Sequence, residues 1–179
     1  MKKKTIVGGM IIVAIAATVI FAGCIEEKAP DITPPTTSVT PGYIRCYDHQ
    51  LDFGYEYPED WETQDTECEF PRERCEIFTK AEGESRIVIA VTSTDLKSLA
   101  EVKGFEYIDR DSILKEGFVE INDRKAYEVI FKQYPDREAK WVIFLANDRE
   151  YAVECYTTEE LYDEYEEIFD HVINSFFIE

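Results

Sequence analysis

Residues 113–156 read ILKEGFVEINDRKAYEVIFKQYPDREAKWVIFLANDREYAVECY, and the architecture of the chain follows from this segment. Apolar and polar residues alternate along much of it, which is typical of β-strands that bury one face. The alternation stops at residues 122–123, 134–136 and 147–148, where Asn, Asp and Pro tolerate tight turns. The segment therefore predicts a meander of four antiparallel strands.

Alternation continues upstream of the meander, and one strand is especially clear there. Its polar residues share one face and residues 58–60 end it; its apolar residues are Leu51, Phe53, Tyr55 and Tyr57. Three more segments have the composition of strands, at residues 62–69, 75–80 and 86–93. With the meander, they predict an antiparallel sheet of about six to eight strands.

Two helices are expected beside this sheet. Thr94 begins a short helix that Gly104 ends. Thr157 and Glu160 form a capping box for a long C-terminal helix. The apolar residues of that helix recur at helical spacing: Leu161, Tyr165, Ile168, Phe169, Val172 and Phe176. An antiparallel sheet with segregated helices belongs to the α+β class.

The charge balance excludes one class of function. The 179 residues include 38 acidic and 19 basic side chains, a formal net charge of −19. Because nucleic acids are bound through clustered Lys and Arg that release counterions, we expect no nucleic-acid partner.

The first 25 residues have the composition of an export signal. Lysines at positions 2–4 precede an uncharged, mostly apolar run over residues 5–25. The run contains FAGC at residues 21–24, which resembles the lipobox of prokaryotic lipoproteins. The resemblance implies a signal peptide over residues 1–23 and a lipid such as palmitate on Cys24. We therefore expect a lipid anchor in the cell membrane, with the rest of the chain on the extracytoplasmic face.

The N-terminal segment allows a second kind of anchor, and a stalk follows it. An uncleaved N-terminal anchor helix is the alternative to the lipoprotein, since about 20 apolar residues can span a bilayer. After Cys24, residues 24–42 are rich in Pro and Thr, which is typical of a semi-rigid stalk. Residues 43–179 then have the length of one globular domain.

Four cysteines lie in the domain, at Cys46, Cys68, Cys75 and Cys155. An even number in an exported domain favours disulfides, and four cysteines allow three connectivities. Of these we favour Cys68 with Cys75 and Cys46 with Cys155. A zinc site would need more closely spaced thiol pairs, because six residues separate Cys68 from Cys75. We expect neither a metal nor a cofactor.

Acidic residues crowd the polar side of the expected C-terminal helix, with no basic residue among them. They are Glu159, Glu160, Asp163, Glu164, Glu166, Glu167 and Asp170. Like charges at this spacing repel one another, and a solvated face screened by salt is one interpretation. The other is a docking face for a basic partner or for weakly held divalent cations.

Catalytic signals are sparse. His49 and His171 are the only histidines, and both are interpreted as surface residues. The sequence has no G-x-x-x-x-G-K-[ST], G-x-G-x-x-G, H-E-x-x-H or G-x-S-x-G motif. We therefore expect no catalytic residues and no enzymatic activity.

Three short segments carry a resemblance to a known family. They read FGYEYPEDW at residues 53–61, INDRKAY at 121–127 and INSF at 173–176. In this order they resemble the PsbP-like family, named for the extrinsic subunit of photosystem II. The resemblance implies an α/β/α sandwich over residues 43–179 and no catalytic centre. Independently of it, Trp61 is expected to plug the core and Tyr127 to pair across strands.

The hypothesis that follows is a membrane-anchored, non-enzymatic binding or assembly-support domain with a partner in the cell envelope. A solute- or cation-binding lipoprotein is one alternative, and would need a pocket. A carboxylate-dependent envelope glycan hydrolase is another, and would need two acids that converge in a cleft.

Overall fold

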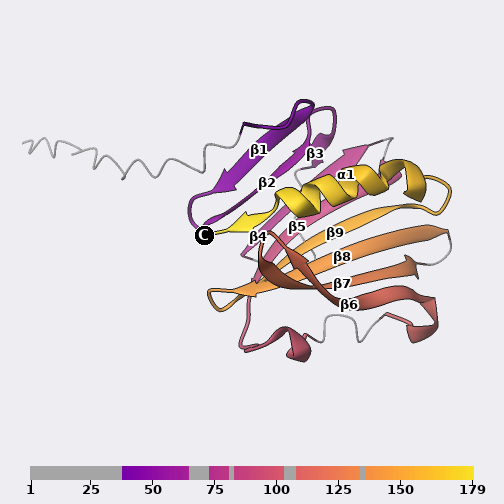
Figure 1. Cartoon of the computed structure of the whole chain (residues 1–179). Coiled ribbons are helices and arrows are strands. Elements are labelled where there is room, and N and C mark those ends of the chain that lie inside the picture. The colour runs from indigo at the N-terminus through magenta and orange to yellow at the C-terminus, as the bar shows by residue number, and fades with distance from the viewer. Residues whose placement is uncertain (1–37, 65–72, 81–82, 103–107, 134–135) are drawn as a thin grey trace, which may run out of the picture. The chain divides into compact units, whose positions relative to one another are not determined.

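The computed structural model describes residues 38–64, 73–80, 83–102, 108–133 and 136–179 (Figure 1). Within these ranges the strands follow one another as β1 (Tyr43–Asp48), β2 (Phe53–Pro58), β3 (Glu62–Gln64), β4 (Arg74–Lys80), β5 (Ser85–Ser93), β6 (Ile113–Ile121), β7 (Arg124–Gln133), β8 (Arg137–Ala146), β9 (Arg149–Thr158) and β10 (Phe177–Ile178). One α-helix, α1 (Tyr162–Ser175), precedes β10.

The strands form two antiparallel sheets. The larger has seven strands in the order β3-β4-β5-β9-β8-β7-β6, and the smaller has three in the order β1-β2-β10. The meander predicted over residues 113–156 is confirmed, because β6, β7, β8 and β9 pair in sequence. Residues 65–69 of the strand predicted over 62–69, and residues 134–135, lie outside the described residues.

Two of the three turns predicted for the meander lie within the described residues, and both form where the sequence placed them. Asn122 and Asp123 have φ of 50° and 60°, and Asn147 and Asp148 have φ of 52° and 55°. Asn and Asp adopt this left-handed conformation at lower cost than other residues with a side chain. Two consecutive left-handed residues match the twist of the flanking strands, so these turns fix the register of the hairpins.

The larger sheet has a packed core on each of its faces. On one face, α1 and the smaller sheet lie beside each other (Figure 1), and they bury Phe53, Trp61 and Phe169 in a first core. Trp61 is 5% exposed and its ring lies edge-on to that of Tyr165, as expected for a core plug. The first core therefore joins the helix to both sheets.

The second core lies on the opposite face of the larger sheet. It includes Val129 and Trp141 from the sheet and Ile108 from the connection between β5 and β6. The short helix predicted from Thr94 to Gly104 is only partly present, as a single 3-10 turn at Leu99–Glu101, and Gly104 lies outside the described residues. A second 3-10 turn, at Arg110–Ser112, lies beyond the predicted helix. Tyr127 does pair across strands as expected, edge-on to the ring of Phe118.

The smaller sheet was not predicted. Gly54, the second residue of β2, lies between β1 and β10: a Cβ there would lie 2.9 Å from the carbonyl oxygen of Cys46 and 2.6 Å from the ring of Phe177. Only glycine fits at this crossing without displacement of β1 or β10. Glu56 of β2 is buried rather than solvated, because Arg45 of β1 and His171 of α1 lie against its carboxylate, which corrects the predicted solvent face.

The predicted capping box is wrong. Thr157 still belongs to β9, is fully buried, and its hydroxyl forms a 2.8 Å hydrogen bond with that of Ser85. The helix begins four residues later than a cap at Thr157 would place it, with Leu161 at its N-cap and no side-chain cap. The predicted apolar stripe is otherwise present, since Tyr165 and Phe169 point into the first core.

Candidate functional site

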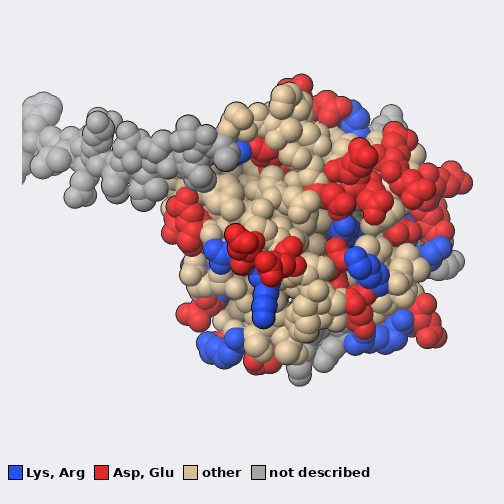
Figure 2. All heavy atoms as spheres, viewed as in Figure 1, with Lys and Arg blue, Asp and Glu red and all other residues tan. Residues whose placement is uncertain are grey.

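The acidic residues predicted around the C-terminal helix form a surface at the start of α1. Six of the seven are exposed, and Asp170 is half-buried. Figure 2 shows a dense group of acidic side chains over the part of the molecule where α1 begins in Figure 1. We call these seven residues the α1 acidic surface.

Two members of the α1 acidic surface have basic partners that the sequence did not indicate. Lys132 of β7 lies 2.9 Å from a carboxylate oxygen of Glu159. Lys140 of β8, only 7% exposed, forms an ion pair with Asp170 and lies 3.5 Å from Glu128. Two lysines of the sheet beneath the helix therefore bind Glu159 and Asp170, the first and last residues of the surface.

The negative charge of this surface reaches the sheet as well. The pKa of the Glu138 carboxyl, on β8, is raised above its ordinary value, first by burial and then by Glu159, Asp163 and Glu166. Lys132 opposes this shift. Glu138 was missed because its position near α1 depends on strand order rather than on local sequence.

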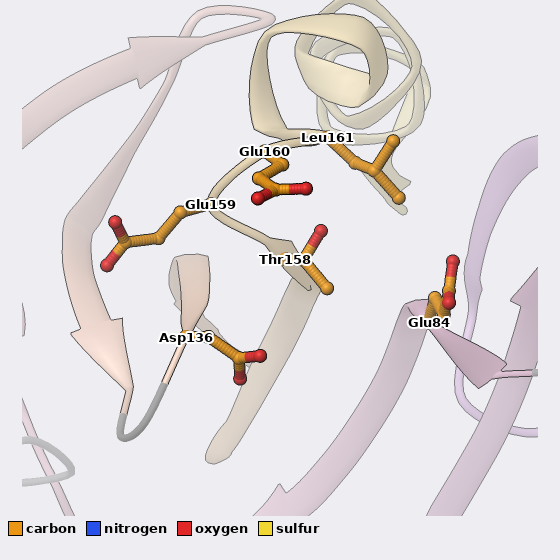
Figure 3. Close-up of a pocket in the computed structure, with 6 residues that line it drawn as sticks. All are labelled: Glu84, Asp136, Thr158, Glu159, Glu160 and Leu161. Carbon is orange, nitrogen blue, oxygen red and sulfur yellow. The ribbon is translucent and has the colours of Figure 1, made fainter.

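A pocket of about 430 Å³ adjoins the surface (Figure 3). Sequence segments far apart meet there, and they contribute Glu84, Asp136, Thr158, Glu159, Glu160 and Leu161. The backbone N–H of Glu159 donates to the carbonyl oxygen of Asp136 at 2.9 Å, which ties the β9–α1 connection to the β7–β8 turn. In Figure 3 the carboxylate of Glu159 points away from Thr158 and Glu84.

The chemistry of the pocket suits binding of positive charge. Its four carboxylates are exposed to solvent, so they are favourably placed to attract Lys and Arg side chains. A general acid for glycan hydrolysis depends on a less solvated setting that raises its pKa. Among the described residues, no group of three or more His, Cys, Asp or Glu is arranged to hold a metal ion.

A second polar centre lies beside the C-terminal half of α1 and was missed by the sequence analysis. Glu56 is 3% exposed, yet its carboxylate lies 2.5 Å from Arg45 and 2.9 Å from the Nε2 of His171. Its backbone N–H donates to the Ser175 hydroxyl at 2.8 Å. Burial alone would raise the pKa of the Glu56 carboxyl, but hydrogen bonds from Thr40, His171 and Arg45 lower it.

This centre corrects the interpretation of His171 as a surface residue. The imidazole is half-buried and lies against the ring of Tyr43 in β1, with ring centroids 3.8 Å apart. The Ser175 hydroxyl donates to the carbonyl of Val172 at 2.8 Å. The polar contacts of Glu56, His171 and Ser175 therefore connect β1, β2 and α1. His49, by contrast, is exposed in the turn after β1, as interpreted.

The structure decides one of the two predicted cysteine pairs. Cys46 and Cys155 are free thiols, so the predicted bond between them is wrong. Cys46 lies beside Glu76 and Arg74 of β4, whereas Cys155 lies beside Lys140 under α1, so the two thiols occupy different parts of the first core.

Cys75 is disulfide-bonded, and its predicted partner Cys68 lies outside the described residues. The N-terminal predictions, including Cys24, also fall outside them. Among the described residues, no helix is both long enough and apolar enough to cross a membrane.

Comparison with curated proteins finds no match. Solved structures from other organisms share the fold. The solution structure of cyanobacterial PsbP (CyanoP) from Synechocystis sp. PCC 6803 has a TM-score of 0.63 at 13% identity and covers 82% of this chain and 100% of its own. A crystal structure from Bacteroides thetaiotaomicron VPI-5482 has a TM-score of 0.52 at 13% identity, over 75% of this chain and 48% of its own.

The family comparison agrees with the fold. A model described as PsbP-like protein matches residues 8–178, which include both sheets and α1. The chain belongs to the PsbP-like family.

Proposed function

We propose that this protein is a membrane-anchored extracytoplasmic lipoprotein whose PsbP-like domain binds or supports another component of the cell envelope without catalysing a reaction. The anchor is a lipid on Cys24, and the Pro- and Thr-rich stalk over residues 24–42 holds the domain away from the bilayer.

The observation that supports a binding role is the α1 acidic surface together with its pocket. Lys132 and Lys140 hold Glu159 and Asp170 in place. The remaining carboxylates are left to solvent. Such a one-sign surface speeds the encounter with an oppositely charged partner and excludes acidic ones. We infer that the partner presents Lys and Arg to this surface.

The anchor is tested by metabolic labelling with a lipid precursor such as palmitate. We expect label in the wild-type protein and none in a Cys24→Ser variant. Label retained by Cys24→Ser would contradict a lipid on this thiol, and unlabelled wild-type protein that stays in the membrane would favour the uncleaved anchor helix.

The binding role is tested by chemical cross-linking in intact membranes. The variant Glu160→Lys/Asp163→Lys/Glu164→Lys reverses three exposed charges of the α1 acidic surface. Its control, Asp95→Lys/Asp111→Lys, reverses exposed acids of the β5–β6 connection instead. A specific cross-linked species should be lost in the first variant and kept in the control. A pattern equal in all three proteins would contradict docking at this surface.

A cation-binding role makes a different prediction for the same variants. Calcium would then raise the melting temperature of the wild-type protein and of the control, but not that of the α1 variant. An unchanged melt in millimolar calcium would leave the protein-docking role as the function of the surface.

A further inference from the structure

β6 is an edge strand of the larger sheet, nine residues long and without proline. Among the described residues it pairs only with β7. Most of its residues are exposed. Backbone N–H and C=O groups on the outer side of such an edge are a ready template for another strand, and proteins usually protect them.

A groove of about 470 Å³ lies along this edge, between β6 and the turn at Leu99–Glu101. Apolar side chains contribute much of its lining, with one acidic and one basic residue beside them: Leu99, Ala100, Phe118, Val119, Glu120 and Lys125. Phe118 is 61% exposed, although an aromatic ring of this size usually lies largely inside a fold. The groove therefore places the exposed ring of Phe118 next to the outer backbone edge of β6.

Gly117 occupies the middle of β6, and nothing in the described fold requires a glycine there. Its φ is not in the left-handed region, and a Cβ built on it would meet no atom within 4 Å. It pairs with Glu128 in a regular part of the ladder, away from the irregularity at residues 113–115. Glycine weakens a strand interior, and one without a bulge or bend often marks a place where another backbone approaches closely.

We propose that β6 is a strand-addition site, at which an extended segment of a partner protein adds an eighth strand to the larger sheet. Main-chain hydrogen bonds to β6 would supply the affinity, and an apolar side chain seated against Phe118 in the groove would supply the specificity. A second side chain of the segment would pack over Gly117, which has no side chain of its own. The inference rests on the proposed binding role and assigns it a second contact surface.

The charge of the chain identifies the kind of segment that fits. A second copy would bring another formal charge of −19 against the first, so self-pairing is opposed by repulsion. An apolar segment flanked by Lys or Arg is attracted instead. The occupant is therefore an extended basic and apolar segment of a different protein.

The experiment uses the full chain in detergent micelles and a phage-displayed library of random decapeptides as the probe. We expect selected peptides that alternate apolar and polar residues and carry Lys or Arg near their ends. Synthetic copies should bind Phe118→Lys at least tenfold more weakly than the wild type, and Gly117→Val more weakly as well. Ile44→Lys is the control, because Ile44 is 42% exposed on β1 of the other sheet.

N-methylation separates strand addition from simple apolar contact. Methyl groups on every second backbone nitrogen should abolish binding in one register and leave it intact in the other, because only alternate N–H groups of an added strand face β6. Binding that is equal in both registers, or equal in Phe118→Lys and the wild type, would overturn the proposal. A library that yields no specific peptide would overturn it too.

Two further outcomes distinguish this proposal from its alternatives. Concentration-dependent dimerisation that Phe118→Lys abolishes would identify a second copy as the occupant and overturn the heterologous one. Cross-linking that depends on the α1 acidic surface, with no effect of Phe118→Lys, would preserve the proposed function and reject the strand-addition site.

Discussion

The polar centre around Glu56 provides the sharpest prediction, through the substitution Glu56→Gln. This change keeps the shape of the side chain and removes its charge, so the variant mimics a protonated Glu56. The side chain is 4% exposed, while its partners Arg45 and His171 are 21% and 26% exposed. A hydrogen bond to a charged group contributes about 1.5–3 kcal/mol, and the partly solvated partners place the loss near the lower end, at about 2 kcal/mol.

The effect should depend on pH in a defined direction. The pKa of Glu56 in the folded protein is lowered from its ordinary value of 4.5. Its contribution to stability is therefore fully present above the pKa of the unfolded chain and is lost as pH falls through the folded pKa. Wild type and Glu56→Gln should differ most near pH 7 and converge as pH falls below the lowered pKa of Glu56 in the folded protein.

Urea unfolding, followed by the fluorescence of the two tryptophans, measures the free energy of unfolding at each pH. Glu167→Gln is the matched control, because Glu167 is an exposed acid on the same helix, and its effect should stay within about 0.5 kcal/mol. A Glu56→Gln variant as stable as wild type at pH 7, or a stability difference that does not narrow as pH falls through the acid range, would refute the reasoning.

Three other predictions follow from the packing, turns and thiols. Phe169→Ala should lower the free energy of unfolding by about 3–5 kcal/mol, since Phe169 is fully buried, and Phe118→Ala by less than about 0.5 kcal/mol; equal losses in chemical denaturation would contradict the assigned core. Asn147→Ala should cost about 1 kcal/mol because φ is 52° there, and an unchanged melting temperature would argue against the left-handed turn. In the native protein, iodoacetamide should modify Cys46 before Cys155, because Cys155 is fully buried whereas Cys46 is only partly buried; mass spectrometry that finds them disulfide-bonded to each other would contradict free thiols.

The larger sheet could be predicted because its signals are local. Segments rich in apolar and aromatic residues mark β6 to β9, and paired Asn and Asp mark two of their turns. In the smaller sheet only β2 has such a signal, since Tyr43–Asp48 mixes polar and apolar residues without regular alternation and β10 is only two residues long. β1 and β10 form because they can pair with the two edges of β2, and this pairing depends on tertiary structure rather than on local sequence.

The candidate site was predictable in charge but not in geometry. The acids of α1 are adjacent in sequence, so their exposure could be expected. Glu84, Asp136 and Glu138 join them only because β5, β8 and β9 lie side by side under the helix start. The burial of Glu56 likewise depends on β1 and α1, which cover the face of β2 that alternation assigns to solvent.

The central claim is that a PsbP-like domain is held by a lipid on the extracytoplasmic face of the membrane. Its most direct measurement treats intact cells with a membrane-impermeant biotin ester and then separates membranes from soluble material. The account predicts that biotinylated wild-type protein is found in the membrane fraction. It also predicts that this fraction contains no mature, lipid-modified form of the Cys24→Ser variant. Full-length wild-type protein that escapes biotinylation and remains soluble inside the cells would contradict it.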